Sequence, residues 1–123
     1  MRREHSKLEL FNKLQLKDYD DDIIISAITK LADQNYQSDN RFSEAFILMR
    51  YNQGNGPVKI ASELKFRGIS TFDLSDYDWF KSAKEIREKK FGDSSSIDFK
   101  DQAKQKRFLL SRGFGLDQIN QAF

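Results

Sequence analysis

Residues 56–69 read GPVKIASELKFRGI, and this stretch decides how we expect the chain to fold. Pro57 is preorganised for the first position of a helix, because its missing N–H would have no intrahelical partner there. Ile60 and Leu64 follow at helical spacing and form an apolar stripe. Gly68 can end the helix in a left-handed cap, so we expect a positive φ there and a cost of about 1–2 kcal/mol for Gly68→Val.

Similar start and stop signals recur along the whole chain. Ser6 with Glu9 forms a capping-box pattern, and Asp78 can cap a later helix. No segment alternates cleanly enough to predict a strand. The sequence therefore predicts an all-α protein that is more than half helical, with a polar loop at 93–96. The expected helices lie near residues 6–17, 20–35, 39–53, 57–67, 70–75, 78–91, 98–112 and 115–123.

One six-residue pattern occurs three times, as LQLKDY at 14–19, LKFRGI at 64–69 and LLSRGF at 109–114. Each copy has a leucine, two further residues, a basic residue, a turn residue and a bulky apolar residue. Copies 45 to 50 residues apart are typical of helical repeat proteins. We therefore expect three units: an incomplete two-helix repeat over 1–36, a three-helix repeat over 37–76 and another over 77–123.

The composition excludes several classes of protein. The chain has no Cys and a single His, His5, which leaves little material for a disulfide scaffold, a zinc site or another metal centre. No apolar run reaches the roughly 18 residues of a membrane span. There is also no phosphate-binding loop and no catalytic triad. We expect a cytoplasmic, non-enzymatic protein without a cofactor.

Charge is spread unevenly, although the net charge is only +2. Residues 79–112 hold ten basic and five acidic side chains. A surface of that kind attracts anionic partners, while solvated helix faces explain the same residues equally well.

Three blocks of residues resemble the RecX family of RecA regulators, and they follow the family's order along the chain. The opening block has Arg2-Arg3-Glu4-His5-Ser6, Glu9-Leu10 and Lys13-Leu14. The middle block has Arg41-Phe42, Ala45-Phe46, Arg50, Gly56-Pro57, Ile60, Glu63-Leu64 and Arg67-Gly68-Ile69. The last block has Lys106, Arg107-Phe108-Leu109, Arg112-Gly113-Phe114 and Ile119.

The resemblance implies a curved, elongated array of three-helix repeats that binds RecA or the RecA–DNA filament and restrains its recombinase and coprotease activities in DNA repair. The charge of the basic C-terminal half makes the DNA of the filament a natural second contact. We expect a monomer. The chain departs from the family pattern at residues 37–40, which read QSDN where the family usually has Leu-Asp-Asp, and in a compressed linker over 71–77.

The family usually has a helix before the opening block, and this chain begins without it. We therefore expect Leu10, Leu14 and Ile24 to be less buried than their counterparts in the middle repeat.

The candidate partner-facing residues are all basic: Arg50, Lys59, Lys65, Arg67, Lys104, Arg107 and Arg112. Reversing Arg67 and Arg112 to Glu is expected to weaken filament binding and to leave thermal stability nearly unchanged. The alternative is a stand-alone nucleic-acid-binding module of the helix-turn-helix type. The segments after Gly68 and Gly113 are short and nearly devoid of Lys and Arg, which argues against a recognition helix.

Overall fold

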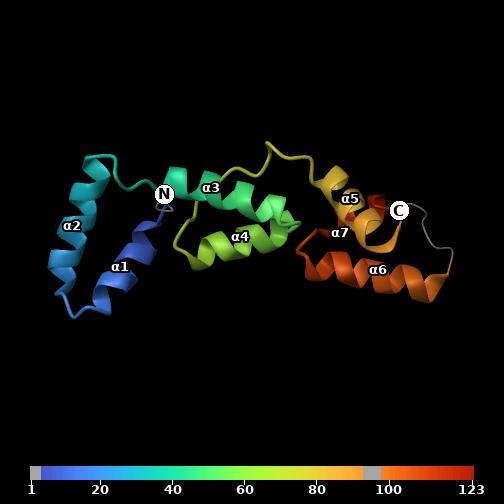
Figure 1. The fold of residues 1–123 in the computed structure, drawn as a ribbon, viewed down its shortest axis with the longest axis horizontal. Helices are drawn as coiled ribbons and strands as arrows, with labels where there is room; N and C mark the ends of the chain where they lie inside the picture. Colours follow the sequence, from blue (N-terminus) through green and yellow to red (C-terminus); the bar gives the residue numbers. More distant parts are fainter. Residues whose placement is uncertain (1–3, 93–97) are drawn as a thin grey trace. The chain divides into compact units, whose positions relative to one another are not determined.

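The computed structural model describes residues 4–92 and 98–123, and every regular element within these ranges is a helix. The predicted loop at 93–96 and the first two residues of the RecX-like opening block lie outside the described residues. The helices are α1 (Lys7–Gln15), α2 (Asp21–Asp33), α3 (Asp39–Asn52), α4 (Pro57–Phe66), α5 (Trp79–Phe91), α6 (Phe99–Ser111) and α7 (Leu116–Gln121) (Figure 1). The all-α prediction is confirmed.

The predicted caps explain where these helices begin and end. The Ser6 hydroxyl accepts from the Glu9 N–H at 3.1 Å, and the Glu9 carboxylate accepts from the Ser6 N–H at 3.1 Å, so the capping box at α1 is confirmed. Asp78 accepts from the Lys81 N–H at 3.0 Å and starts α5. Pro57 is the first residue of α4, and Gly68 has a φ of 82°, as predicted.

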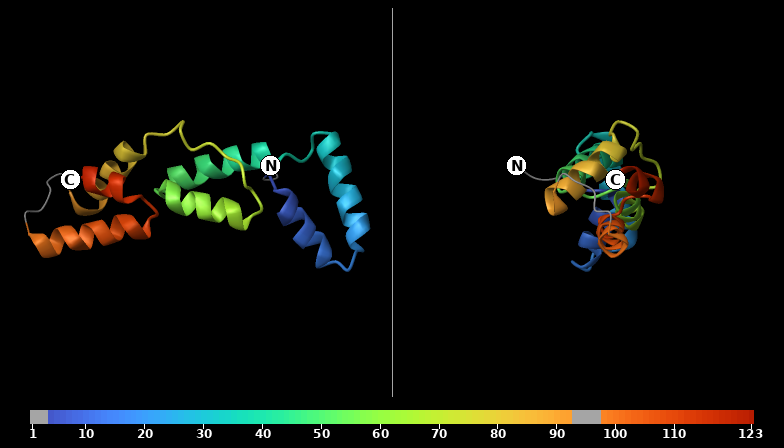
Figure 2. Two further views of the ribbon diagram at one scale, coloured as in Figure 1. Left: turned by 180° about the vertical axis from the view of Figure 1, so that it is seen from behind. Right: turned by 90° about the vertical axis from the view of Figure 1, so that its right-hand side faces the viewer.

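The chain divides into two compact units. Unit 1 comprises residues 1–48 and 63–72, and unit 2 comprises residues 49–62 and 73–123. In unit 1, α1 and α2 pack side by side (Figures 1 and 2). Its buried apolar side chains are Ile24, Ile28, Phe42, Phe46, Ile47, Leu64 and Ile69. In unit 2, α5 packs on both α6 and α7. Its buried apolar side chains are Ile60, Trp79, Ala83, Leu109, Phe114, Ile119 and Ala122.

The helix predicted over residues 70–75 is absent, and that prediction is wrong. The Asp73 carboxylate accepts from both the N–H and the hydroxyl of Ser75, at 2.8 and 2.6 Å. Such a local turn competes with helix formation. The indole N–H of Trp79 then donates to the Leu74 carbonyl at 2.7 Å, which fixes the segment as a non-helical connection.

The expected exposure of the first repeat is confirmed at two of three positions. Leu10 and Leu14 are partly exposed, whereas their counterparts Ile60 and Leu64 are both 0% exposed. Ile24 is 1% exposed, so the expectation is wrong for this residue. The packing of α1 against α2 accounts for its burial.

Candidate partner-binding surface

In unit 1, the turn that follows α4 docks on the start of α1. The Ser6 hydroxyl donates to the Arg67 carbonyl at 2.8 Å. A Cβ atom added at Gly68 would lie 2.8 Å from the Cβ of Leu8, which is closer than real Cβ atoms approach. Two independent features therefore require a glycine at position 68: the positive φ and the close approach of the turn to α1.

In unit 2, the turn that follows α6 docks on the start of α4 in the same manner. The Gly56 N–H donates to the Arg112 carbonyl at 2.7 Å, and the Val58 N–H donates to the Gly113 carbonyl at 2.9 Å. A Cβ atom added at Gly113, where φ is 94°, would lie 2.1 Å from the Cβ of Lys59. Most of the glycines that carry the RecX resemblance thus build backbone-to-backbone junctions.

The copy at 14–19 adopts the same turn, but its bulky residue is not buried. Asp18 has a φ of 61°, in the left-handed region that Gly68 and Gly113 also occupy. Tyr19, however, is 53% exposed, whereas the equivalent Ile69 and Phe114 are 4% and 1% exposed. The bulky residue therefore anchors its turn in two of the three copies.

Two of the predicted partner-facing arginines are engaged inside their own units. The Arg112 guanidinium donates to the Gly54 carbonyl at 3.3 Å and also to the Gln53 carbonyl. Arg67 lies 3.6 Å from the Glu9 carboxylate, and its guanidinium sits over the Phe46 ring at 4.8 Å. The expectation that reversing both charges leaves stability nearly unchanged is inconsistent with these contacts.

The other five candidates fall in both units and differ in exposure. In unit 2, Lys104 and Arg107 are exposed on α6, Lys59 is half-buried, and the Arg50 guanidinium donates to the Gln53 side chain at 2.7 Å. In unit 1, Lys65 is exposed.

The remaining family-motif residues serve packing and caps. The Arg41 guanidinium binds the side chain and the carbonyl of Asn35, both at 2.8 Å, and pairs with Glu4 at 3.0 Å. Glu63 is partly exposed, and its carbonyl accepts from the Arg67 guanidinium at 3.2 Å. Several others are core residues with exposures of 2% or less: Phe42, Ile60, Leu64, Leu109 and Phe114.

Sequence reasoning missed a groove in unit 2 between the end of α3 and the helices α5 and α6. Its volume is about 370 Å³, and it is lined by Asn52, Gln53, Gly54, Ile86, Lys89, Lys90, Phe108 and Arg112. The lining has three basic side chains and no carboxylate. The ring of Phe108 forms one wall, with Phe91 edge-on at 5.4 Å and the Lys90 ammonium at 5.7 Å from its centroid. The basic pair at 89–90 could have been noticed in the sequence, but nothing there places it beside Phe108.

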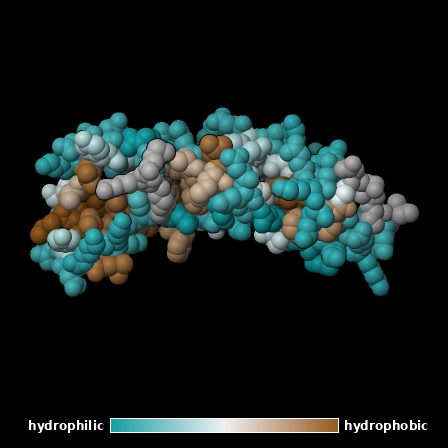
Figure 3. Space-filling model, in the orientation of Figure 1, coloured by the Kyte–Doolittle hydropathy of each residue, from teal (hydrophilic) through white to brown (hydrophobic). Residues whose placement is uncertain are grey.

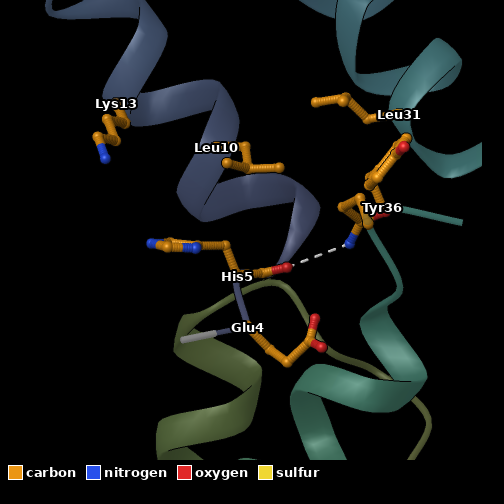
Figure 4. Close-up of a pocket in the computed structure, with 7 residues that line it drawn as sticks. Glu4, His5, Leu10, Lys13, Leu31 and Tyr36 are labelled. Carbon is orange, nitrogen blue, oxygen red and sulfur yellow. Dashed lines mark hydrogen bonds between the residues drawn. The ribbon is translucent and has the colours of Figure 1, made fainter. Parts of the chain in front are cut away.

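A second, larger groove lies in unit 1 beside α1 and α2, with a volume of about 830 Å³ (Figure 4). Leu10, Leu31 and Tyr36 contribute apolar surface to it. The Gln37 amide donates to the His5 carbonyl at 3.3 Å, and its own buried oxygen has no partner among the described residues. Unit 1 also exposes apolar side chains over α1 and α2, which include Leu16, Ile23 and Ile25 (Figure 3).

Other kinds of site are not evident in the part of the chain that the structure describes. No three His, Cys, Asp or Glu side chains in these ranges are grouped closely enough to hold a metal ion. None of the described helices has the length and apolar character needed to span a membrane.

Comparison with known proteins identifies the family. The model of the third three-helix domain of RecX matches residues 76–123, and that of the second three-helix domain matches residues 38–74. A regulatory protein RecX from Acinetobacter baylyi is 39% identical over 125 residues, covering 98% of this chain and 79% of the relative. The chain belongs to the RecX family.

Further RecX proteins agree with this assignment. Regulatory protein RecX from Halorhodospira halophila is 34% identical, and that from Legionella pneumophila is 38% identical, covering 98% and 99% of this chain. The crystal structure of RecX from Lactobacillus salivarius matches with a TM-score of 0.78 at 25% identity, covering 98% of this chain and 84% of that one. The relatives are named as regulatory proteins, so the family role is regulatory.

Proposed function

We propose that this chain binds RecA and the RecA–DNA filament and restrains the recombinase and coprotease activities of RecA, acting without a cofactor as a cytoplasmic monomer. Membership of the RecX family carries the proposal. The two docked turns support it, because hydrogen bonds to the carbonyls of Arg67, Arg112 and Gly113 tie helix ends together and give each unit a rigid surface on which to present side chains.

The partner-facing surface is refined by the contacts of the basic residues. Arg67 and Arg112 hold their own units together, so they are weaker candidates for contact with RecA. Lys104 and Arg107 remain exposed on α6, and Lys65 remains exposed on α4. These three side chains are therefore the first choice for charge reversal.

The alternative of a stand-alone helix-turn-helix module gains no support from unit 2. A recognition helix presents basic and amide side chains to the major groove. The helix after the α6 turn, α7, has only six residues and reads LDQINQ, which contains an aspartate and no Lys or Arg.

The test measures binding to RecA filaments assembled with ATP on single-stranded DNA, together with their DNA-dependent ATP hydrolysis and strand exchange. Wild-type protein is expected to bind and to slow strand exchange. Lys104→Glu combined with Arg107→Glu is expected to weaken binding about tenfold, as loss of charge-complementary contacts does at an interface. Wild-type protein that neither binds RecA nor changes its activity would refute the proposal.

A further inference from the structure

The groove of unit 2 combines features that together indicate an anionic ligand. Lys89 and Lys90 from α5 and Arg112 from the end of α6 line it, and no carboxylate does. The two glutamates of α5 face other cations: Glu85 lies 3.9 Å from Lys81, and Glu88 lies 3.9 Å from Arg87. The positive charge of the groove is therefore not neutralised from within its lining.

Two cations, Lys104 and Arg112, also lie along one face of α6, and Arg112 additionally donates to the Gln53 and Gly54 carbonyls. Lys104, Phe108 and Arg112 are spaced four residues apart, so they lie on successive turns of the same face. The span from Lys104 to Arg112 is about 12 Å at 1.5 Å per residue. One strand of B-form DNA carries a phosphate about every 3.4 Å along its axis, so this line matches roughly three phosphates.

We propose that this groove, with Lys104 at its outer end, binds the sugar–phosphate backbone of a nucleic-acid strand. An acidic protein segment fits less well, because Lys104 and Arg112 are about 12 Å apart along α6, which is farther than one or two carboxylates extend. The proposal draws on the proposed function only for the expectation that DNA is within reach of the bound protein.

The lining also predicts which part of a nucleic-acid strand the groove contacts. The face of Phe108 already has Lys90 at 5.7 Å, and Phe91 meets the ring edge-on, so the ring is poorly placed to stack on a base. Ile86 and Phe108 instead offer apolar surface to sugars. Binding is therefore dominated by phosphate contacts, which makes it salt-dependent and nearly independent of base sequence.

The experiment uses the full chain and DNA alone, without RecA, so that its outcome is separate from that of RecA binding. Fluorescence anisotropy of a labelled 15-nucleotide strand is measured from 50 to 200 mM salt, with two strands of different base composition. The variant Lys89→Glu/Lys90→Glu is compared with Lys81→Glu/Lys84→Glu. The control pair lies on the same helix, is exposed and changes the net charge equally, but lies outside the groove.

Wild-type protein is expected to bind both strands with similar micromolar affinity, in the range of non-specific DNA binding. The groove variant is expected to bind at least tenfold more weakly, and its salt slope is expected to fall by about 1.4, since each phosphate contact with a single strand contributes about 0.7. The control variant is expected to stay within twofold of wild type. Far-ultraviolet circular dichroism verifies that both variants are folded, and Lys89→Gln/Lys90→Gln repeats the test with a milder change.

Three results would overturn the proposal. An equal loss of DNA affinity in the groove and control variants would show that only the net charge of the protein matters. An unchanged DNA affinity in both groove variants would show that Lys89 and Lys90 do not contact the DNA. Competition by polyglutamate as effective as that by unlabelled DNA, at equal concentration of charge, would show that the groove accepts an acidic protein segment instead.

Discussion

Replacing Gly113 with alanine tests whether the docked turn of unit 2 holds that unit together. Gly113 has a φ of 94°, and an added Cβ would meet the Cβ of Lys59 at 2.1 Å and its backbone nitrogen at 2.8 Å. Neither neighbour is the free end of a flexible side chain, so the turn has to move away from α4. Such a movement strains the hydrogen bonds that Gly56 and Val58 donate to this turn.

The expected loss of stability has three parts. A non-glycine residue in the left-handed region costs about 1–2 kcal/mol. Overpacking at a closely packed position adds about 1–3 kcal/mol. Weakening of the two backbone hydrogen bonds adds about 0.5–1.5 kcal/mol for each bond that breaks. If both bonds break, the sum is about 3–8 kcal/mol, which is a large share of the roughly 5–15 kcal/mol that stabilises a typical domain.

Gly92 supplies a matched control within the same unit. Its φ is 98°, close to that of Gly113, but an added Cβ would meet nothing within 4 Å. With a ψ of 175°, Gly92 lies in an extended positive-φ region that is essentially restricted to glycine, so Gly92→Ala carries a conformational cost alone, about 1–3 kcal/mol. The overpacking and hydrogen-bond terms, about 2–6 kcal/mol together, occur only in Gly113→Ala and measure the docking of the turn on α4.

Urea unfolding followed by tryptophan fluorescence is the appropriate assay. Trp79 is the only tryptophan, it lies in unit 2 and it is 7% exposed, so it reports on the unit that contains both glycines. Circular dichroism at 222 nm follows both units, and two separate transitions would require the units to be fitted independently. If Gly113→Ala costs no more than Gly92→Ala, the reasoning about the junction is refuted.

Further predictions concern single side chains. Replacing Arg67 with Glu is expected to destabilise the protein by about 1–2 kcal/mol in thermal unfolding, because it removes the cation over an aromatic ring and sets a second carboxylate beside Glu9; an unchanged midpoint would contradict this. The hydrogen bonds from Ser75, its side chain first and its N–H second, hold the pKa of the Asp73 carboxyl below its ordinary value. The turn is therefore fully stabilised at pH values above the ordinary pKa of the carboxyl, and it loosens as the pH falls through the lowered pKa. Carbon-detected NMR titration should show that the pKa returns towards its ordinary value in Ser75→Ala. Arg87 is 1% exposed and donates to the Ala122 carbonyl at 2.7 Å, so Arg87→Met is expected to cost about 2–3 kcal/mol and to speed amide exchange in α7, whereas unchanged exchange would count against this role.

Helix boundaries were predictable from the sequence where a single residue type determines the local geometry. Ser6, Pro57 and Asp78 start helices because their side chains or rings suit a helix start, and Gly68 and Gly113 end them with positive φ. These signals are local, so the sequence carries them in full.

The errors arose where side-chain contacts, rather than the spacing of apolar residues, decide the outcome. The segment at 70–75 is predicted as a short helix, but a side-chain turn at Asp73 and the indole of Trp79 hold it in another conformation. Ile24 was expected to be uncovered, yet it is 1% exposed, with α2 packed against α1. Neither contact leaves a periodic signal in the sequence.

For the candidate surface, the sequence predicted only that basic residues are in excess. An excess of basic residues over 79–112 is visible in the sequence, but their contacts are not. Arg112 looks like an exposed helix-end cation and instead binds the carbonyls of Gln53 and Gly54. Lys89 and Lys90 looked like solvated residues of α5 and instead line a groove with Phe108.

The three turns of the repeated pattern show how docking selects the residue type. All three turn residues have positive φ, at 61° for Asp18, 82° for Gly68 and 94° for Gly113. Conformation alone permits an aspartate, since Asp and Asn adopt the left-handed region more readily than most residues. Docking excludes an aspartate at Gly68 and Gly113. These two turns approach a neighbouring helix so closely that a Cβ atom would collide with Leu8 or Lys59. A side chain at this position thus distinguishes the turn whose bulky residue is exposed from the two turns whose bulky residue is buried, and the change from glycine to aspartate within the repeat is a structural signal that the sequence already contained.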